Sequence, residues 1–225
     1  KFPTLVSSRI DRFGSSYWCF GFGKLYVDDV EIYPCFKSAA LLSTFPPCLP
    51  ACVLQGIDTD NCYFANADGS SVLKDGSIHP NNRKIIQYYP FVDGLDGNEG
   101  HGTAVAATIV GKRYSGQGMA DGIAPDAKIS FFDIGNDSDP SNSQCCSIPP
   151  DITLFLNKAR SAGAKIQNIS WGTAATNDYI SLDQALDDFL YNDQDSIIIV
   201  AAGNSGPGAN TVVSPALAKN VITGA

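Results

Sequence analysis

One of only two histidines in this 225-residue chain lies in the segment GNEGHGTAVAATIVG, residues 97–111. This residue, His101, stands between two glycines at the start of a run of small residues that predicts a helix. Such a histidine is poorly placed for packing and well placed for exposure at a helix N-terminus. It is either a group available for chemistry or a residue that only caps or shapes a turn.

A second candidate segment is IIIVAAGNSGPG, an apolar run that ends in a glycine-rich turn. A turn of this kind can hold a phosphate, but Gly203, Gly206 and Gly208 follow G-x-x-G-x-G rather than G-x-G-x-x-G, and no helix pattern comes next. A nucleotide-binding function is therefore disfavoured. The side-chain amide of Asn204 could instead donate a hydrogen bond to an anion that develops on a carbonyl oxygen. The alternative is a turn asparagine without a chemical role.

Alternating strands and helices have to position these segments. Four short apolar runs predict strands: RKIIQYYPF, AKISFFDIG, AKIQNISWG and DSIIIVAAG. Two amphipathic segments between them predict helices: PPDITLFLNKARSAG and SLDQALDDFLYN. This alternation indicates an α/β fold with a doubly wound, mostly parallel sheet and helices on both faces. In such sheets, chemistry collects at the carboxyl ends of the strands.

The two predicted helices have distinct end signals. In the first, Pro150 fits the first turn and Gly163 supplies the stop. In the second, Ser181 and Gln184 have the spacing of a capping box. The apolar stripes expected to face the core are Ile152, Phe155, Leu156 and Ala159 in the first helix, and Leu182, Ala185, Leu186 and Phe189 in the second.

Taken together, HGTAVAATIVG, NISWG and AAGNSG resemble, in this order, the motifs of the subtilisin-like serine peptidases, or subtilases. The connecting segments GIAPDAKI and VVSPALAKNVITGA are also similar to their counterparts in that family. The resemblance covers roughly residues 56–225, and the ordered combination is far more specific than any single motif. It favours a catalytic role for His101 over a structural one.

The resemblance implies a serine endopeptidase that hydrolyses polypeptides with an Asp/His/Ser triad. His101 matches the catalytic histidine, which takes the proton of the nucleophile and returns it to the leaving amine. Asn204 matches the asparagine of the oxyanion hole. The residues expected to lie beside the extended substrate are Ser170, Trp171, Gly172 and Gly203.

The aspartate of the triad is ambiguous, because the segment ACVLQGIDTDNCYF departs from the family pattern D-[ST]-G. In one register, Asp58 and Thr59 are the first two residues of the pattern and Asp60 replaces the glycine. In the other, Gly56 is the motif glycine and Leu54 occupies the place of the aspartate. The second register keeps the glycine and is favoured. Asp58 is then the best surviving candidate, and its alternative role is that of a solvated turn carboxylate.

The nucleophilic serine is missing, since the motif G-T-S-x-A does not occur in the chain. We therefore expect a fragment of a peptidase whose fold is incomplete at the C-terminus, and we expect this chain alone to be inactive. The serine would be encoded downstream of Ala225. The alternative is a non-catalytic, subtilase-like binding or interaction protein.

Composition restricts the partners and the compartment. A net charge of -8 without a basic stripe argues against nucleic acid, and no apolar run is long enough to span a membrane. Seven cysteines indicate an oxidising, extracellular or luminal compartment, and their odd number leaves at least one thiol without a partner in the chain. Residues 1–50 are rich in cysteine and proline and receive no fold, whereas residues 51–225 form the peptidase-like domain. The oligomeric state is not predicted.

No cofactor or metal is predicted, with calcium as the one candidate. The acidic loop DIGNDSDPSNSQCC contains three carboxylates that could supply oxygen ligands: Asp133, Asp137 and Asp139. Acidic loops of this kind are usually only solvated.

Overall fold

The computed structural model describes residues 25–27, 30–32, 50–97, 100–113, 121–137, 146–173 and 178–224. The chain separates into two units, residues 1–37 and 38–225. In the first unit, β1 (Leu25–Val27) and β2 (Val30–Ile32) pair in antiparallel orientation. Most of the cysteine- and proline-rich segment that received no fold lies outside the described residues.

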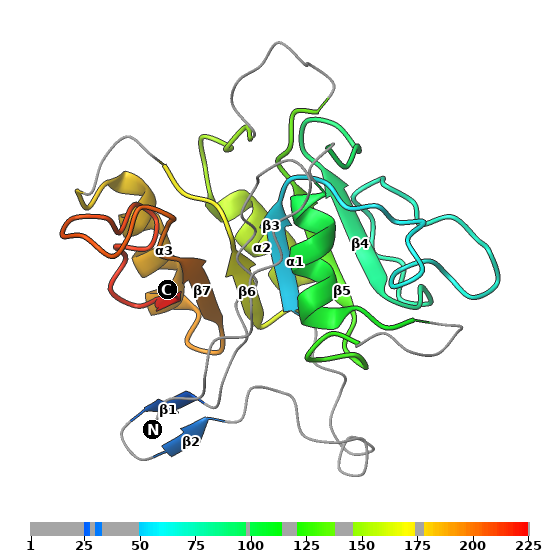
Figure 1. The fold of residues 1–225 in the computed structure, drawn as a ribbon, viewed down its shortest axis with the longest axis horizontal. Coiled ribbons are helices and arrows are strands. Elements are labelled where there is room, and N and C mark those ends of the chain that lie inside the picture. Colours follow the sequence, from blue (N-terminus) through cyan, green and yellow to red (C-terminus); the bar gives the residue numbers. More distant parts are fainter. Residues whose placement is uncertain are drawn as a thin grey trace. The chain divides into compact units, whose positions relative to one another are not determined.

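The second unit is built on a six-stranded sheet (Figure 1). Its strands are β3 (Pro50–Leu54), β4 (Ile85–Pro90), β5 (Ile129–Asp133), β6 (Ile166–Ile169), β7 (Ile197–Ala201) and β8 (Ile222–Gly224). They lie in the order β4-β5-β3-β6-β7-β8, and each neighbouring pair is parallel.

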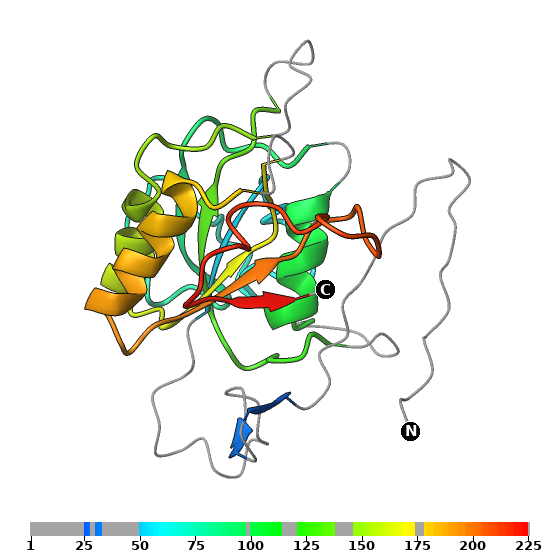
Figure 2. The same ribbon diagram turned by 90° about the vertical axis from the view of Figure 1, so that its left-hand side faces the viewer.

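Within the described ranges, three helices cover this sheet: α1 (His101–Val110), α2 (Thr153–Ser161) and α3 (Ser181–Asn192). Figure 2 shows α1, in green, on one face of the sheet and α2 and α3 on the opposite face. Parallel strands need crossover connections, and these helices supply three of them. The predicted α/β fold with helices on both faces is confirmed.

The order of the strands explains where a site can form. From β3 the chain passes to the edge strand β4 and returns through α1 to β5, beside β3. It then crosses β3 through α2 and continues to β6 on the other side. Both helical crossovers, from β4 to β5 and from β5 to β6, run in the same direction across the sheet, and the carboxyl ends of the parallel strands lie at one edge, where sites form in such folds.

The predicted apolar stripe of α2 is confirmed. Its members are at most 4% exposed and lie in the core: Ile152, Phe155, Leu156 and Ala159. The helix begins later than predicted, at Thr153, so Pro150 precedes the first turn instead of occupying it. Gly163 ends the helix as predicted, with the positive φ of 96° that favours glycine.

Helix α3 has the predicted bounds, but its cap lies one position earlier than predicted. Ile180 is the N-cap residue, and the Asp183 carboxylate accepts its backbone N–H at 2.9 Å. Ser181 is already inside the helix, so the predicted pairing of Ser181 with Gln184 does not form the box. Leu182, Ala185 and Phe189 pack against the core, and Leu186 is fully buried within it.

Asp187 joins α3 to the turn that precedes β8. Its carboxylate accepts the backbone N–H groups of Lys219, at 2.9 Å, and Asn220, at 2.7 Å. It also accepts the Tyr179 hydroxyl at 2.8 Å, and the Lys219 ammonium lies over the Tyr179 ring. The Asp187 side chain therefore connects α3 to two other segments, the one that precedes the helix and the one that precedes β8.

Replacing this carboxylate tests its contribution to folding. We expect Asp187→Ala to lower the free energy of unfolding by about 1 kcal/mol, because two backbone N–H groups and one hydroxyl lose their acceptor. Urea denaturation measures the change. Asp188→Ala, at an exposed neighbouring position, is the control and should alter the midpoint much less. Equal effects of the two substitutions would contradict the assignment.

Candidate functional site

The predicted site residues lie at or near the carboxyl ends of three neighbouring strands. Gly56 and Asp58 follow β3, Ser170 to Gly172 follow β6, and Gly203 and Asn204 follow β7. Because β3, β6 and β7 are adjacent and parallel, these ends share one edge of the sheet. His101 is the first residue of α1, which packs on β3 from one face.

The first turn of α1 rests directly on the backbone that leaves β3. Gly102 is buried, and an added Cβ would overlap the carbonyl oxygens of Gln55 and Gly56. The N-cap, Gly100, has a φ of 59°, a conformation that side chains rarely adopt. His101 is therefore located at a helix N-terminus as predicted, half-buried between two glycines that the backbone requires.

The two candidate positions of the triad aspartate, Leu54 and Asp58, lie at the end of β3 and in the turn that follows it. Gly56 is buried, and an added Cβ would overlap the carbonyl oxygen of Leu95, so a glycine is needed there. Leu54 is the last residue of β3 and pairs with Asp133 of β5. The packing thus explains why residue 56 is a glycine, and the choice between the two registers stays a prediction.

Asp58 has the environment of a turn carboxylate. The residue is exposed, and its Oδ1 accepts the backbone N–H of Asp60 at 3.1 Å. Its own N–H donates to the Thr103 hydroxyl at 2.7 Å, so its backbone, rather than its carboxylate, is tied to α1. A triad role for Asp58 stays a prediction.

The ends of β6 and β7 meet a common loop. Cβ atoms added to Gly172 and Gly203 would lie 3.0 and 3.3 Å from the same methyl group, Cγ2 of Val213. The Ser214 carbonyl accepts the N–H of Thr173 at 2.8 Å, which fastens this loop to the end of β6. Asn204 is exposed directly after Gly203, whose φ is 108°.

The other two residues expected beside the substrate have internal contacts. The Ser170 hydroxyl accepts the Asn168 amide at 2.8 Å. Trp171 is 9% exposed and packs in the hydrophobic core, and its Nε1 has no hydrogen-bond partner among the described residues. The side chains of Ser170 and Trp171 are thus engaged within the protein at this edge of the sheet.

A group of carboxylates borders the histidine side of the site. Asp96 accepts the Thr103 hydroxyl at 2.7 Å, and Asp93 accepts the backbone N–H of Asp137 at 2.9 Å. Burial raises the pKa of Asp96, and the hydrogen bond from Thr103 opposes that rise. Sequence reasoning missed Asp96 and Thr103. The available signal was the position of Thr103 two residues after His101.

Asp133 is the fully buried member of this group. Its Oδ2 accepts the Tyr88 hydroxyl at 2.6 Å, and its Oδ1 accepts the Gly135 N–H at 2.8 Å. The Tyr88 oxygen in turn accepts the N–H of Ile57, the residue after Gly56, at 3.3 Å. Burial raises the pKa of Asp133 to about 7, against the lowering effect of both hydrogen bonds, and Asp93 and Asp137 raise it further.

The calcium prediction is not tested by this geometry. Both carboxylate oxygens of Asp133 accept hydrogen bonds from the protein, Asp137 packs against Gly97, and Asp139 lies outside the described residues. Within the described ranges, no group of three or more His, Cys, Asp or Glu side chains is arranged to hold a metal ion.

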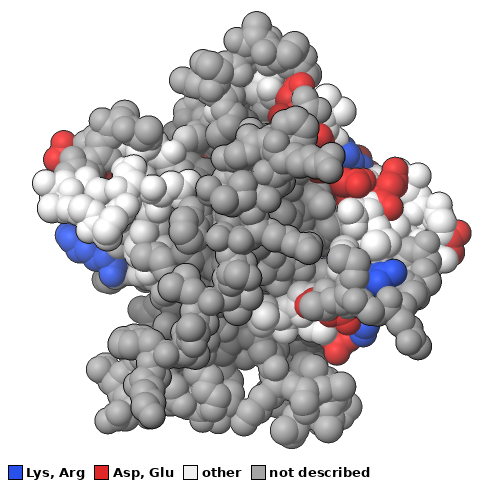
Figure 3. Space-filling view, viewed as in Figure 1, with Lys and Arg blue, Asp and Glu red and all other residues white. Residues whose placement is uncertain are grey.

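Other features of the described residues bear on partners. None of their helices is both long and apolar enough to cross a bilayer. On the face shown in Figure 3, Lys and Arg lie scattered among Asp and Glu over the described surface. Cys62 is an exposed free thiol.

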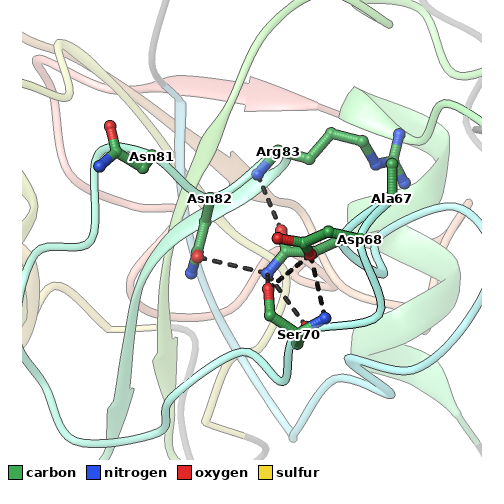
Figure 4. A pocket seen from close by; sticks show the side chains of 7 residues that line it. Ala67, Asp68, Ser70, Asn81, Asn82 and Arg83 are labelled. Atoms are coloured by element: carbon green, nitrogen blue, oxygen red, sulfur yellow. Dashed lines mark hydrogen bonds between the residues drawn. The ribbon is translucent and has the colours of Figure 1, made fainter.

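A polar pocket lies beside the opposite end of the sheet (Figure 4). The buried amide of Asn66 organises it, donating to Ser70 and Asn82 and accepting the Arg83 backbone N–H at 2.9 Å. These residues precede the amino end of β4, whereas the candidate site residues follow carboxyl ends. The pocket is therefore separate from the candidate site.

The contact beneath α1 can be tested by adding one methyl group. We expect Gly102→Ala to destabilise the protein by about 3 kcal/mol or to prevent folding, because the added Cβ meets two backbone carbonyls that cannot move independently. Ala104→Gly, at an exposed position of the same helix, should cost only about 1 kcal/mol. Thermal unfolding followed by circular dichroism compares them, and an equal or smaller effect of Gly102→Ala would contradict the contact.

Buried Asp133 should make stability depend on pH. Because its folded pKa of about 7 exceeds the ordinary value of 3.8, the folded protein holds the proton more tightly than the unfolded chain does. The free energy of unfolding should therefore fall as pH rises through this interval, and Asp133→Asn should have a shallower slope between pH 5 and about 8. Urea denaturation at several pH values measures both slopes. Asp188→Asn should keep the wild-type slope, and an unchanged slope in Asp133→Asn would exclude this role.

The comparisons with known proteins agree with this geometry. Residues 51–224 match the model of the subtilase family. The Dictyostelium discoideum "Serine protease/ABC transporter B family protein tagD" is 36% identical over 177 residues, which cover 75% of this chain and 9% of that protein. Mycosin-3 of Mycobacterium tuberculosis is 30% identical over 177 residues, which cover 71% of this chain and 38% of that protein.

Among solved structures, the S218A mutant of the protease domain of PatA has a similar fold, with a TM-score of 0.55 and 22% identity. That similarity covers 78% of this chain and 56% of the PatA chain. The chain spans less than a tenth of the length of the Dictyostelium relative. The subtilase model, in contrast, matches well over half of the chain. The chain therefore belongs to the subtilase family.

Proposed function

We propose that this chain supplies the amino-terminal part of a subtilisin-like serine endopeptidase domain. The observation that carries the proposal is the shared edge of the sheet: His101 begins α1 above the end of β3, and Asn204 follows β7, two strands away. Both residues belong to motifs whose order along the chain is that of the family. The substrate is a polypeptide, and the compartment is extracellular or luminal.

In this proposal, His101 acts as the general base. Its ring takes the proton of a serine hydroxyl as that oxygen attacks the scissile carbonyl, and later gives the proton to the leaving amine. Asn204 donates its amide hydrogen to the oxygen that becomes negative in the tetrahedral intermediate. Removal of this donor costs about 3 kcal/mol of transition-state stabilisation in subtilisin, and the magnitude belongs to that enzyme.

The substrate backbone would lie along the residues after β6. Gly172 and Gly203 carry no side chains, so their backbone groups at the two strand ends are open to an extended peptide on the side away from Val213. Backbone groups from Ser170 to Gly172 would pair with the peptide as an added strand does. The Val213 methyl group, close to both glycines, borders this space.

Two parts of the triad are not supplied by matched motifs in this chain. We propose that a longer product of the same gene carries G-T-S-x-A after Ala225, and that its full-length transcript encodes Asp-Thr or Asp-Ser directly before Gly56, in place of Leu54 and Gln55. The 225-residue chain alone is then inactive. A non-catalytic binding protein is the alternative, and Leu54 at the place of the aspartate is the observation that favours it.

Sequencing the full-length transcript tests both missing parts. We expect it to encode Asp-Thr or Asp-Ser directly before Gly56 and the motif G-T-S-x-A after Ala225. A transcript that reads CLPACVLQ before Gly56 and stops after Ala225 would leave the binding protein as the remaining function.

A fluorophosphonate probe tests the chemistry. The longer product should react with the probe, and the 225-residue chain should not. His101→Ala should slow peptide hydrolysis by the longer product by about 1,000-fold or more, and Asn204→Ala by about 100-fold or more. His79→Ala, at the other histidine, is the control and should keep full activity. Labelling of the 225-residue chain, or full activity of His101→Ala, would disprove the proposal.

A further inference from the structure

The hydroxyl of Thr103 connects three segments at the N-terminus of α1. Its Oγ1 accepts the backbone N–H of Asp58 at 2.7 Å and donates to Oδ2 of Asp96 at 2.7 Å. Asp58 belongs to the turn after β3, and Asp96 belongs to the segment between β4 and α1. Thr103 itself lies in the first helical turn, two residues after His101.

A hydroxyl side chain makes both of these contacts through a single oxygen atom. It carries one proton to donate and lone pairs to accept, and here it uses one of each in different directions. Thr108, in the same helix, shows the ordinary alternative, because its hydroxyl donates at 2.9 Å to the Ala104 carbonyl one turn earlier. Thr103 thus makes long-range contacts where Thr108 makes a local one.

The three segments joined by Thr103 are already in close backbone contact. Gly102 lies against the carbonyls of Gln55 and Gly56, and Gly56 lies against the carbonyl of Leu95. Contacts between backbone atoms set how closely the segments approach and which face of the helix meets the end of β3. Two hydrogen bonds from one side chain, to two different loops, add a further restraint on rotation of the helix about its axis.

The acceptor Asp96 adds an electrostatic reason for the hydroxyl. Its other oxygen, Oδ1, is buried and has no hydrogen-bond partner among the described residues. Oδ2 lies 3.9 Å from the position of a Cβ on Gly100, the N-cap residue, where the helix dipole favours a negative charge. Asp58 is a like charge nearby, and Lys74 is the opposite charge that acts on Asp96. The hydrogen bond from Thr103 therefore fixes the position of Oδ2 in this carboxylate.

We infer that Thr103 is a positioning residue for His101: its hydroxyl locks the first turn of α1 to the loops on either side and so fixes the direction in which the imidazole is presented. The catalytic meaning of this role rests on the proposed function. The structural part does not, because it concerns the environment of His101 in the chain itself.

The two histidines of the chain make a direct test practical. Diethylpyrocarbonate modifies imidazole rings, and peptide mapping by mass spectrometry separates His101 from His79. The measured quantity is the ratio of the two modification rates in the same sample, at two pH values. His79 is bound to Asp75 at 3.0 Å, on a segment that makes no hydrogen bond to Thr103, and serves as the internal reference.

We expect Thr103→Val to change this ratio by about threefold or more, because the helix turn loses both restraints. Thr103→Ser should restore the ratio, and Thr108→Val should leave it unchanged. General destabilisation would alter the rates of both histidines together. Should Thr103→Val fail to fold, Thr103→Ala replaces it, since alanine suits a helix best. A ratio equal to that of the wild type in the folded variant would overturn the inference.

Activity of the longer product supplies the second measurement. We expect Thr103→Val to lower kcat by about tenfold, with little change in KM, and Thr103→Ser to restore it. A wild-type product that cleaves no peptide would refute the proposed function, while the modification ratio would still decide the role of Thr103. An altered KM with unchanged kcat would instead overturn its role in positioning His101.

Discussion

The site depends on one steric constraint, the contact between the first turn of α1 and the backbone that leaves β3. No side chain fits at Gly102, because the carbonyls of Gln55 and Gly56 occupy that space. Gly56 is constrained in turn by the carbonyl of Leu95. A helix can approach a strand end this closely only through glycine. The location of His101, one residue before the contact, is therefore set by backbone packing.

The elements could be predicted from local sequence because their apolar periodicity is strong. The bounds of α3 and the buried face of α2 follow directly from it. The cap of α3 could not be predicted in this way, since Asp183 and Gln184 can each bond back to a residue three positions earlier, and only the start of the helix decides between them. The bonds of Tyr88 with Asp133 and of Thr103 with Asp58 join residues 45 positions apart, which no local pattern reveals.

The candidate site was predictable to the extent that its residues belong to contiguous motifs. His101 and Asn204 are such residues, and the sheet brings their segments to one edge. The aspartate register was ambiguous, because each of two registers, with Asp58 or Leu54 at the place of the aspartate, keeps only part of the family pattern. The structure shows that Gly56 packs against the carbonyl of Leu95, a contact that sequence spacing alone could not reveal.

The two sides of the site differ in charge, and the difference suits the proposed chemistry. Carboxylates gather on the side of α1, β4 and β5, where Asp96 and Asp133 lie. The ends of β6 and β7 offer glycines and the neutral amide of Asn204. A general base that becomes an imidazolium gains from nearby negative charge, whereas an oxyanion gains from its absence. The sheet order separates these needs, because β3 stands between the acidic strands and the neutral ones.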